Sequence, residues 1–209
     1  MSQGSYWLLA SRRGRHGSKS AHQAQDRSRA TVNALIQATA HILVKEGFDK
    51  ASTNRIAERA GVSIGSLYQY YPTKEALVVA VIERHHEALM QIVREALSAL
   101  QGLPLEQGIR RLVAAAIDGH RVDPPLHRAL TEQLPRIGRL AGLEAYNREA
   151  HGLARAYLET QRDQIRMDDL EMATFIVATS VEALTHNAVL GRPDGLAGGA
   201  AEALVDEIT

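Results

Sequence analysis

Two short helical segments joined by a glycine, within residues 52–71, constrain the fold of this 209-residue chain more than any other feature. A hydroxyl side chain at position 52 or 53 can cap the first helix, and Ser63 can cap a second helix over 64–70. Gly61 supplies the positive-φ residue that a tight turn needs. Apolar residues suited to a shared core are Ile56, Ala57, Ala60, Val62 and Leu67. The pattern is typical of a helix-turn-helix.

The rest of the chain is also predicted to be helical. An apolar stripe at positions 35, 38, 39, 42 and 43 precedes the helix pair, and a long helix is expected over about 74–100 after it. Pro and Gly residues divide the remainder into helices at roughly 105–121, 125–134, 140–165, 168–190 and 197–208. The sequence shows no strand alternation and no phosphate-binding glycine loop. We therefore predict an all-α fold of about nine helices, with an N-terminal three-helix helix-turn-helix domain and a C-terminal helical bundle.

Composition and charge indicate the domain organisation. Residues 1–27 are rich in Ser, Gly, Gln and Arg without a period, so we expect a disordered basic arm, either a solvated tail or a minor-groove arm. Residues 28–75 form the predicted helix-turn-helix domain, and residues 76–209 a second domain. Residues 1–85 hold 12 basic and 6 acidic residues, whereas the remainder holds 12 and 18. In a chain of zero net charge, this asymmetry suggests that the first part contacts a polyanion.

The composition also excludes several classes of protein. The chain has no cysteine, which rules out a disulfide framework, a thiolate metal site and a cysteine nucleophile. No stretch approaches the ~18 consecutive apolar residues of a membrane-spanning helix. The short apolar run at 6–10 precedes the nearest arginines, which is the reverse of a secretory signal. We therefore expect a cytoplasmic protein without membrane contact.

The second helix of the pair carries side chains that suit a DNA-contacting surface. Three of the six tyrosines lie at 68, 70 and 71. Tyr71 is expected to pack inward with Leu67, while Tyr68 and Tyr70 point elsewhere. A phenol can donate to a phosphate oxygen, and Gln69 can pair with adenine. The simpler alternative is an ordinary helical hairpin with an exposed pair of tyrosines.

Residues around this helix favour contact with a phosphate backbone. Gly65 disfavours helix formation, which makes sense if a DNA backbone must approach closely. Ser63 and Ser66 can donate to phosphate, and the helix N-termini at Thr53 and Ser63 offer free N–H groups. The cations on either side of this helix are Arg55 and Lys74.

Residues 35–77 resemble the DNA-binding domain of TetR-type transcriptional regulators. The stretches that carry the resemblance are Gly47-Phe48, Ser52-Thr53, Ile56-Ala57, Ala60-Gly61-Val62-Ser63, Gly65-Ser66-Leu67-Tyr68-Gln69-Tyr70-Tyr71 and Lys74-Glu75-Ala76-Leu77. One departure is Tyr71, where that family more often has Phe, and another is the basic arm before Ser28.

The resemblance implies a homodimer that binds a double-stranded DNA operator. Its third helix would enter the major groove, and residues 76–209 would bind a small-molecule effector and dimerise through the last two helices. The residues that match base- or backbone-facing positions are Ile64, Gly65, Ser66, Tyr68 and Gln69, and those that match phosphate contacts are Thr53, Tyr70 and Lys74. The segment 168–190 can instead belong to the core of its own subunit.

The C-terminal half offers no strong signal for chemistry. Candidate ligand contacts are Tyr146, Asn147, His151, Tyr157 and Phe175, although a helical bundle can equally use them as structure. Among the histidines at 120, 127, 151 and 186, none pairs with another His at i, i+4, and no HExxH is present, so we predict no metal site. Spacing shows no nucleophile–base arrangement, so we also predict no enzyme activity and no cofactor.

Together these observations favour a ligand-responsive DNA-binding transcriptional regulator. The expected form is a repressor that a small-molecule effector releases from a pseudo-palindromic operator. The alternative is a helical small-molecule-binding protein or enzyme that uses the helix-turn-helix only as a scaffold.

Overall fold

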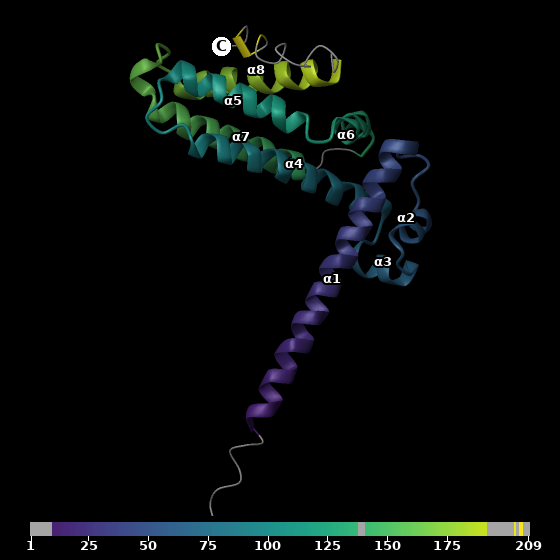
Figure 1. Cartoon of the computed structure of the whole chain (residues 1–209). Helices are drawn as coiled ribbons and strands as arrows, with labels where there is room; N and C mark the ends of the chain where they lie inside the picture. Colours follow the sequence, from purple (N-terminus) through teal and green to yellow (C-terminus); the bar gives the residue numbers. More distant parts are fainter. Residues whose placement is uncertain (1–9, 138–140, 192–202, 204, 207–209) are drawn as a thin grey trace, which may run out of the picture.

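The computed structural model describes residues 10–137, 141–191, 203 and 205–206. These residues form eight α-helices and one short 3₁₀ helix and contain no strand, which confirms the predicted all-α fold (Figure 1). The helices are α1 (Ala10–Glu46), α2 (Thr53–Ala60), α3 (Ile64–Tyr70), α4 (Lys74–Ser98), α5 (Leu105–His120), α6 (Pro124–Ile137), α7 (Ala141–Thr160), η1 (Arg162–Gln164) and α8 (Leu170–Gly191). Most of the predicted helix at 197–208 lies outside the described residues.

The N-terminal segment differs from the prediction of a disordered arm at 1–27. Helix α1 already begins at Ala10, and its first half projects away from the other helices (Figure 1). Residues 22–26 are exposed, so helix propensity rather than burial accounts for this part. Ten of the eighteen residues at 10–27 are Ala, Gln, Arg or Lys, all strong helix formers. The sequence prediction missed this helix because it relied on periodic apolar residues. Such a pattern indicates that one face of a helix is buried, and a helix without a buried face does not show it. Residues 1–9 lie outside the described part.

The N-terminal unit is built on one apolar cluster shared by α1, α2, α3 and the start of α4. All five residues predicted to line one face of α1 are at most 4% exposed: Leu35, Ala38, Thr39, Ile42 and Leu43. Leu35, Ala38 and Ile42 belong to this cluster, whereas Leu43 packs in a second cluster. From the other helices come Ile56 and Ala57 of α2, Leu67 of α3 and Leu77 of α4. Burial of these side chains fixes α2 and α3 against α1.

The second cluster connects the N-terminal unit to the bundle. Val78, Val81 and Ile82 of α4 pack with Leu43 of α1 and with Leu130 of α6. Each is no more than 4% exposed. Tyr71 packs against both clusters, as expected for a residue predicted to turn inward. The start of α4 is therefore held by α1 and α6 together.

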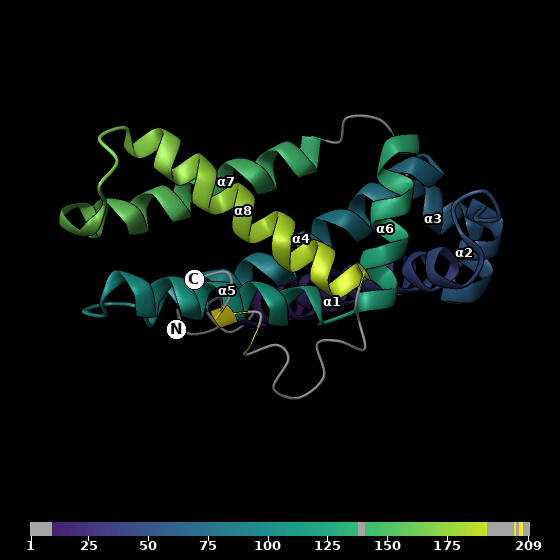
Figure 2. The ribbon, with the colours of Figure 1, turned by 90° about the horizontal axis from the view of Figure 1, so that it is seen from above.

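The C-terminal part is a bundle in which α4 packs on α5 and α7, and α8 packs on α5 and α7. Figure 2 shows α8 crossing between α5 and α7. Tyr157 of α7 is 8% exposed and lies in a cluster with Leu100 and Leu158. Its phenol lies so close to Gly108 of α5 that a Cβ there would come within 1.7 Å of the phenol oxygen. The close approach of the Tyr157 phenol therefore requires a glycine at position 108.

Helix α8 is long and apolar enough on average to pass for a membrane span by length and composition, although it contains no unbroken apolar run of the length considered above. It also carries polar groups, including Glu171, Glu182 and His186. Its exposed apolar residues are Met172, Phe175, Ile176 and Leu184, each at least 45% exposed. Such a surface fits a protein interface at least as well as lipid.

Candidate nucleic-acid interface and ligand cavity

The geometry of the helix pair follows from its local sequence. The Ser52 hydroxyl accepts a hydrogen bond from the Arg55 N–H, and the Ser63 hydroxyl accepts one from the Ser66 N–H. Gly61 ends α2 with φ 69° and ψ 28°, the left-handed conformation expected at this turn. The predicted bounds of the second helix, 64–70, are confirmed. Ser52, and not Thr53, is the residue that caps α2.

Helix α3 presents one face to the core and the opposite face to solvent. Leu67 is completely buried, whereas Ile64 is 38% and Tyr68 51% exposed. Gly65 and Gln69 are exposed as well. The space around Gly65 is open, since a Cβ there would meet only the Ser63 hydroxyl at 3.9 Å. Packing within the chain therefore does not explain the glycine.

Tyrosines 68 and 70 have different surroundings. The Tyr68 phenol is hydrogen-bonded to the Thr53 hydroxyl across a distance of 3.1 Å, which joins α3 to the first turn of α2. Tyr70 is partly buried and packs against the first apolar cluster. Of the two, Tyr68 is the more accessible to a ligand.

Both predicted cations already have partners within the chain. The Arg55 guanidinium forms an ion pair with the Glu46 carboxylate at 2.6 Å and donates to the Lys50 carbonyl oxygen. The Lys74 ammonium donates to the Phe48 carbonyl oxygen at 3.1 Å and lies 3.8 Å from the centre of the Phe48 ring. Each cation thus helps to position the helix pair, whatever else it contacts.

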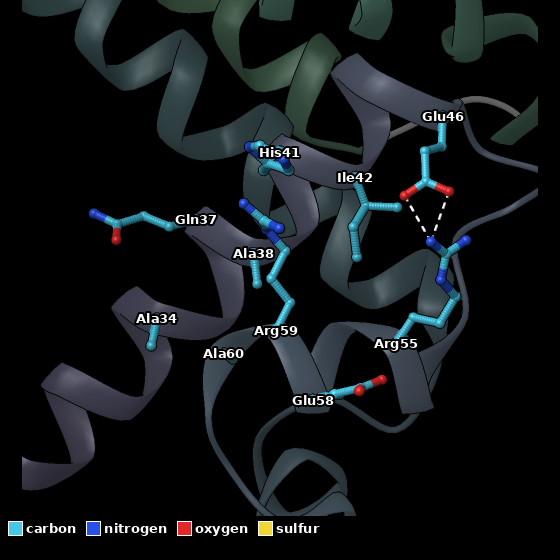
Figure 3. A pocket seen from close by; sticks show the side chains of 10 residues that line it. All are labelled: Ala34, Gln37, Ala38, His41, Ile42, Glu46, Arg55, Glu58, Arg59 and Ala60. Atoms are coloured by element: carbon cyan, nitrogen blue, oxygen red, sulfur yellow. Dashed lines mark hydrogen bonds and ion pairs between the residues drawn. The ribbon is translucent and has the colours of Figure 1, made fainter.

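An open hollow of about 750 Å³ lies between α1 and α2. Figure 3 shows the Glu46–Arg55 pair at one side of it, with Glu58 and Arg59 also lining it. Both signs of charge are present, and small alanines form part of the wall. A mixed-charge hollow of this kind is a poor site for either an anion or an apolar ligand.

A second cavity, of about 590 Å³, lies within the C-terminal bundle. Its walls are mostly apolar, with Met90, Val93 and Leu97 from α4. Four of the five predicted ligand contacts line it: Tyr146, Asn147, His151 and Phe175. Glu182 and His186 line it too, although the sequence prediction did not include them.

The fifth predicted contact, Tyr157, is not among the residues that line this cavity. Its side chain packs in the cluster with Leu100 and Leu158 instead. Tyr146 and Tyr157 are both on α7, eleven residues apart in the sequence. Eleven residues are close to three helical turns, so the two side chains project from similar faces of α7. Their different surroundings therefore result from the packing of neighbouring helices and not from their positions around α7.

Four histidines from four helices come together beside the cavity. His127 of α6 is hydrogen-bonded through Nδ1 to His85 Nε2 of α4 and through Nε2 to His186 Nδ1 of α8, at 2.8 Å in each case. His120 of α5 approaches His127 and His186 edge to face. The Glu182 carboxylate is 3.5 Å from His120 Nε2. One ligand nitrogen from each of His120, His127 and His186 lies within 4.8 Å of the others.

Burial sets the protonation of this cluster. Desolvation lowers the pKa of His85 to about 4 and that of His127 to about 3, so both rings are neutral at neutral pH. Desolvation also lowers the pKa of His186. For His120 burial acts in the same direction, but the neighbouring Glu182 carboxylate outweighs it and raises the pKa.

The prediction of no metal site rested on spacing along single helices, and it did not anticipate this cluster. His120, His127 and His186 belong to α5, α6 and α8, so no i, i+4 pattern links them. Only the packing of three helices brings the rings together.

The capped helix pair with an exposed second helix defines a helix-turn-helix protein of the DNA-binding class. A family model described as bacterial regulatory proteins of the tetR family matches residues 35–81. A second model, described as a tetracyclin repressor-like C-terminal domain, matches residues 104–209, which is half of the chain. The chain belongs to the tetR family of bacterial regulatory proteins.

Individual relatives and solved structures agree with this assignment. The transcriptional activator FasR of Mycolicibacterium smegmatis is 35% identical over 98 residues, covering 47% of this chain and 44% of FasR. The transcriptional repressor KstR of the same species is 36% identical over 55 residues, covering 26% of this chain and 27% of KstR. The chain thus spans less than half the length of these curated relatives.

Two solved structures share the fold. The fatty acid degradation regulator FadR from Bacillus halodurans has a TM-score of 0.64 at 18% identity, covering 85% of this chain and 92% of FadR. A TetR family transcription regulator from Marinobacter aquaeolei has a TM-score of 0.61 at 22% identity, covering 88% and 96%.

Proposed function

We propose that this protein is a cytoplasmic, ligand-responsive transcriptional regulator that binds a double-stranded DNA operator through α3. The observation that carries the proposal is the outward face of α3, where Ile64, Tyr68 and Gln69 are exposed while Leu67 anchors the helix from behind. A short helix held in this way fits the major groove, where base edges can be read. The open space at Gly65 is consistent with close approach of the DNA backbone.

The proposed domain division is a DNA-binding unit at 28–75 and an effector-binding and dimerisation unit at 76–209. The cavity of about 590 Å³ supports effector binding, because its size suits a small molecule. Its walls favour a ligand with an apolar body, and Tyr146, Asn147 and His151 offer polar contacts. A ligand that prefers one shape of this bundle would shift the population between DNA-binding and released forms.

Dimerisation through α8 supplies the second half of an operator-binding unit. The exposed stripe of Met172, Phe175, Ile176 and Leu184 would be covered by the same stripe of a second copy. Two copies related by a two-fold axis place two α3 helices on one side, and half-sites about 34–36 Å apart match one turn of DNA. This geometry requires a pseudo-palindromic operator.

The alternative of an enzyme or carrier with a helix-turn-helix scaffold is less well supported. It gives no reason for the exposed Tyr68 and Gln69, nor for a helix-disfavouring glycine in open space at position 65. Relatives include both an activator and a repressor. We propose the repressor form, in which effector binding lowers operator affinity.

In vitro selection of duplexes from a random pool tests the proposal. We expect enrichment of a pseudo-palindrome, with binding that weakens steeply with salt, by a slope of about −0.9 for each phosphate contact. Fluorescence anisotropy on the selected duplex gives the slope. Failure to enrich any sequence, together with no duplex binding at low salt, would overturn the proposed function.

A further inference from the structure

We propose that His120, His127, His186 and Glu182 bind a divalent transition-metal ion of the zinc class at the junction of α5, α6 and α8. The three ring nitrogens lie within 4.8 Å of one another. Nitrogens held about 2.0–2.1 Å from a tetrahedral zinc ion lie about 3.3–3.4 Å apart. Small side-chain rotations are therefore enough to close the cluster around an ion.

His120 has a nitrogen lone pair available for a metal. Its Nδ1 is 2.7 Å from the Ala116 carbonyl oxygen, which can only accept, so Nδ1 carries a proton and donates it. When the ring is neutral, the other nitrogen, Nε2, carries the lone pair that a metal ion could use. This atom is buried and has no hydrogen-bond partner among the described residues, with the Glu182 carboxylate next to it at 3.5 Å. The Glu182 carboxylate favours a positive charge on this nitrogen, and a metal ion can supply that charge in place of a proton.

His127 is held in the orientation that a metal ligand needs. With its proton on Nδ1, it donates to His85 Nε2 at 2.8 Å, and its Nε2 accepts from His186 Nδ1, a hydrogen bond that a bound metal ion would replace. Metal-bound histidines commonly donate their second ring N–H to such a partner, which fixes the ring and the tautomer. His85, itself 6% exposed, would therefore act as a positioning residue and not as a ligand.

The cavity gives an ion a route to the site. His186 and Glu182 line both the cluster and the cavity of about 590 Å³. The Glu182 side chain is 50% exposed, so it can turn toward an ion without first breaking a buried contact. Its negative charge would offset part of the charge of the ion.

The type of ligand selects the class of metal. Imidazole nitrogens suit Zn²⁺, Co²⁺, Ni²⁺ and Cu²⁺, whereas Mg²⁺ and Ca²⁺ prefer all-oxygen sites. A set of three imidazoles and one carboxylate favours Zn²⁺ or Co²⁺. The competing explanation is a chain of neutral histidines held together only by hydrogen bonds, which would bind no ion with appreciable affinity.

Titration of the tag-free, metal-stripped full chain with Co²⁺, monitored by visible absorption, tests the proposal. We expect one equivalent per protomer with the intense d–d bands of a tetrahedral or five-coordinate site, displaced by Zn²⁺. We also expect His186→Gln and Glu182→Gln each to weaken Zn²⁺ binding by roughly tenfold or more, measured by competition with a chelating dye. His41→Gln, on the exposed side of α1, is the matched control and should bind as the wild type does.

Each outcome of this experiment decides the matter. Binding of less than one equivalent by the wild type, or equal Zn²⁺ affinity of the wild type and both cluster variants, would overturn the proposal. Circular dichroism and thermal melts establish that the variants are folded, and the solvent-accessible Glu182→Gln change keeps the test valid if His186→Gln unfolds. The measurement uses no DNA, so its result is independent of the proposed regulatory function.

Discussion

The Tyr68 phenol and the Thr53 hydroxyl lie 3.1 Å apart, so the exposed face of α3 is tied directly to the first turn of α2. These are the two elements that would contact DNA from opposite sides of the turn. The hydrogen bond is at the surface, where it contributes little to folding because water can replace it. Its main effect is to orient the phenol.

The Tyr68 side chain provides the first prediction. We expect Tyr68→Ala to lower operator affinity by roughly five- to thirtyfold, because this is the effect of losing one or two contacts at about 1 kcal/mol each. Thermal stability should change little, since the residue is 51% exposed. Tyr68→Phe, which keeps the ring and removes only the hydroxyl, is the control that separates ring contacts from the hydrogen bond. Anisotropy at fixed salt measures both variants, and undiminished affinity of Tyr68→Ala would refute this role.

Gly65 provides a prediction in which stability and binding change in opposite directions. Alanine at an exposed helix position is favoured over glycine by about 0.8–1.0 kcal/mol, and the space around Gly65 can hold a Cβ. Gly65→Ala should therefore raise the thermal midpoint. If a DNA backbone approaches this position, the same change should weaken operator binding. Increased stability without a loss of affinity would show that the glycine has no role in DNA contact.

Lys74 is predicted to serve two purposes. Its ammonium donates to the Phe48 carbonyl oxygen and lies over the Phe48 ring, so Lys74→Met should cost roughly 1–2 kcal/mol of stability. If the same charge lies near a phosphate, the slope of log affinity against log salt should fall by about 0.9 per protomer. Urea melts and a salt series measure the two effects separately. A stability loss with an unaltered slope would limit Lys74 to its structural contact.

Gly108 and Tyr157 provide a test of the bundle that does not involve DNA. A Cβ on Gly108 would lie 1.7 Å from the Tyr157 phenol oxygen and 2.7 Å from Cζ, so Gly108→Ala should destabilise the protein by about 1–3 kcal/mol. Tyr157→Phe alone should leave stability unchanged or raise it, because the buried hydroxyl has no hydrogen-bond partner among the described residues. The double variant should recover only part of the loss, since Cζ remains close. Denaturant melts of the three variants measure the changes in unfolding free energy. If the change in the double variant equals the sum of the two single changes, the contact between Gly108 and Tyr157 is not supported.

The exposed apolar face of α8 leads to a prediction about assembly. Ile176 is 45% exposed in the single chain, so Ile176→Glu should not disturb the core. In a dimer packed through α8, the same change buries a charge and should convert the dimer to monomers. Sedimentation equilibrium measures the change, with Glu171→Gln on the same helix as the control. A dimer that survives Ile176→Glu would place the interface elsewhere.

Local features of the sequence were sufficient to predict the helix pair. Ser63, Gly61 and the apolar residues of α2 and α3 act over one or two turns, so their conformations follow from neighbouring residues. The same holds for the stripe on α1, where all five predicted residues are buried. In the helix pair and in α1, the residues that helix periodicity places on one face are also the residues that are buried.

Features that depend on long-range packing could not be predicted. The histidine cluster combines side chains from α4, α5, α6 and α8, separated by up to about a hundred residues, and only the order of helix packing decides which rings meet. Tyr157 was predicted to line the ligand cavity for the same reason that Tyr146 was, yet the tight approach of α5 at Gly108 holds it in the core. The prediction for residues 10–27 differed for another reason: residues 22–27 are exposed, and an exposed stretch of helix leaves no apolar period to detect.

The central claim is that the outward face of α3 reads base edges. The most direct test compares the wild type with Gln69→Ala on the selected duplex and on duplexes with one base pair changed at each position. The account predicts that Gln69→Ala loses about 1–3 kcal/mol of discrimination at one base pair of each half-site while nonspecific binding stays the same. An unchanged preference at every position would contradict it.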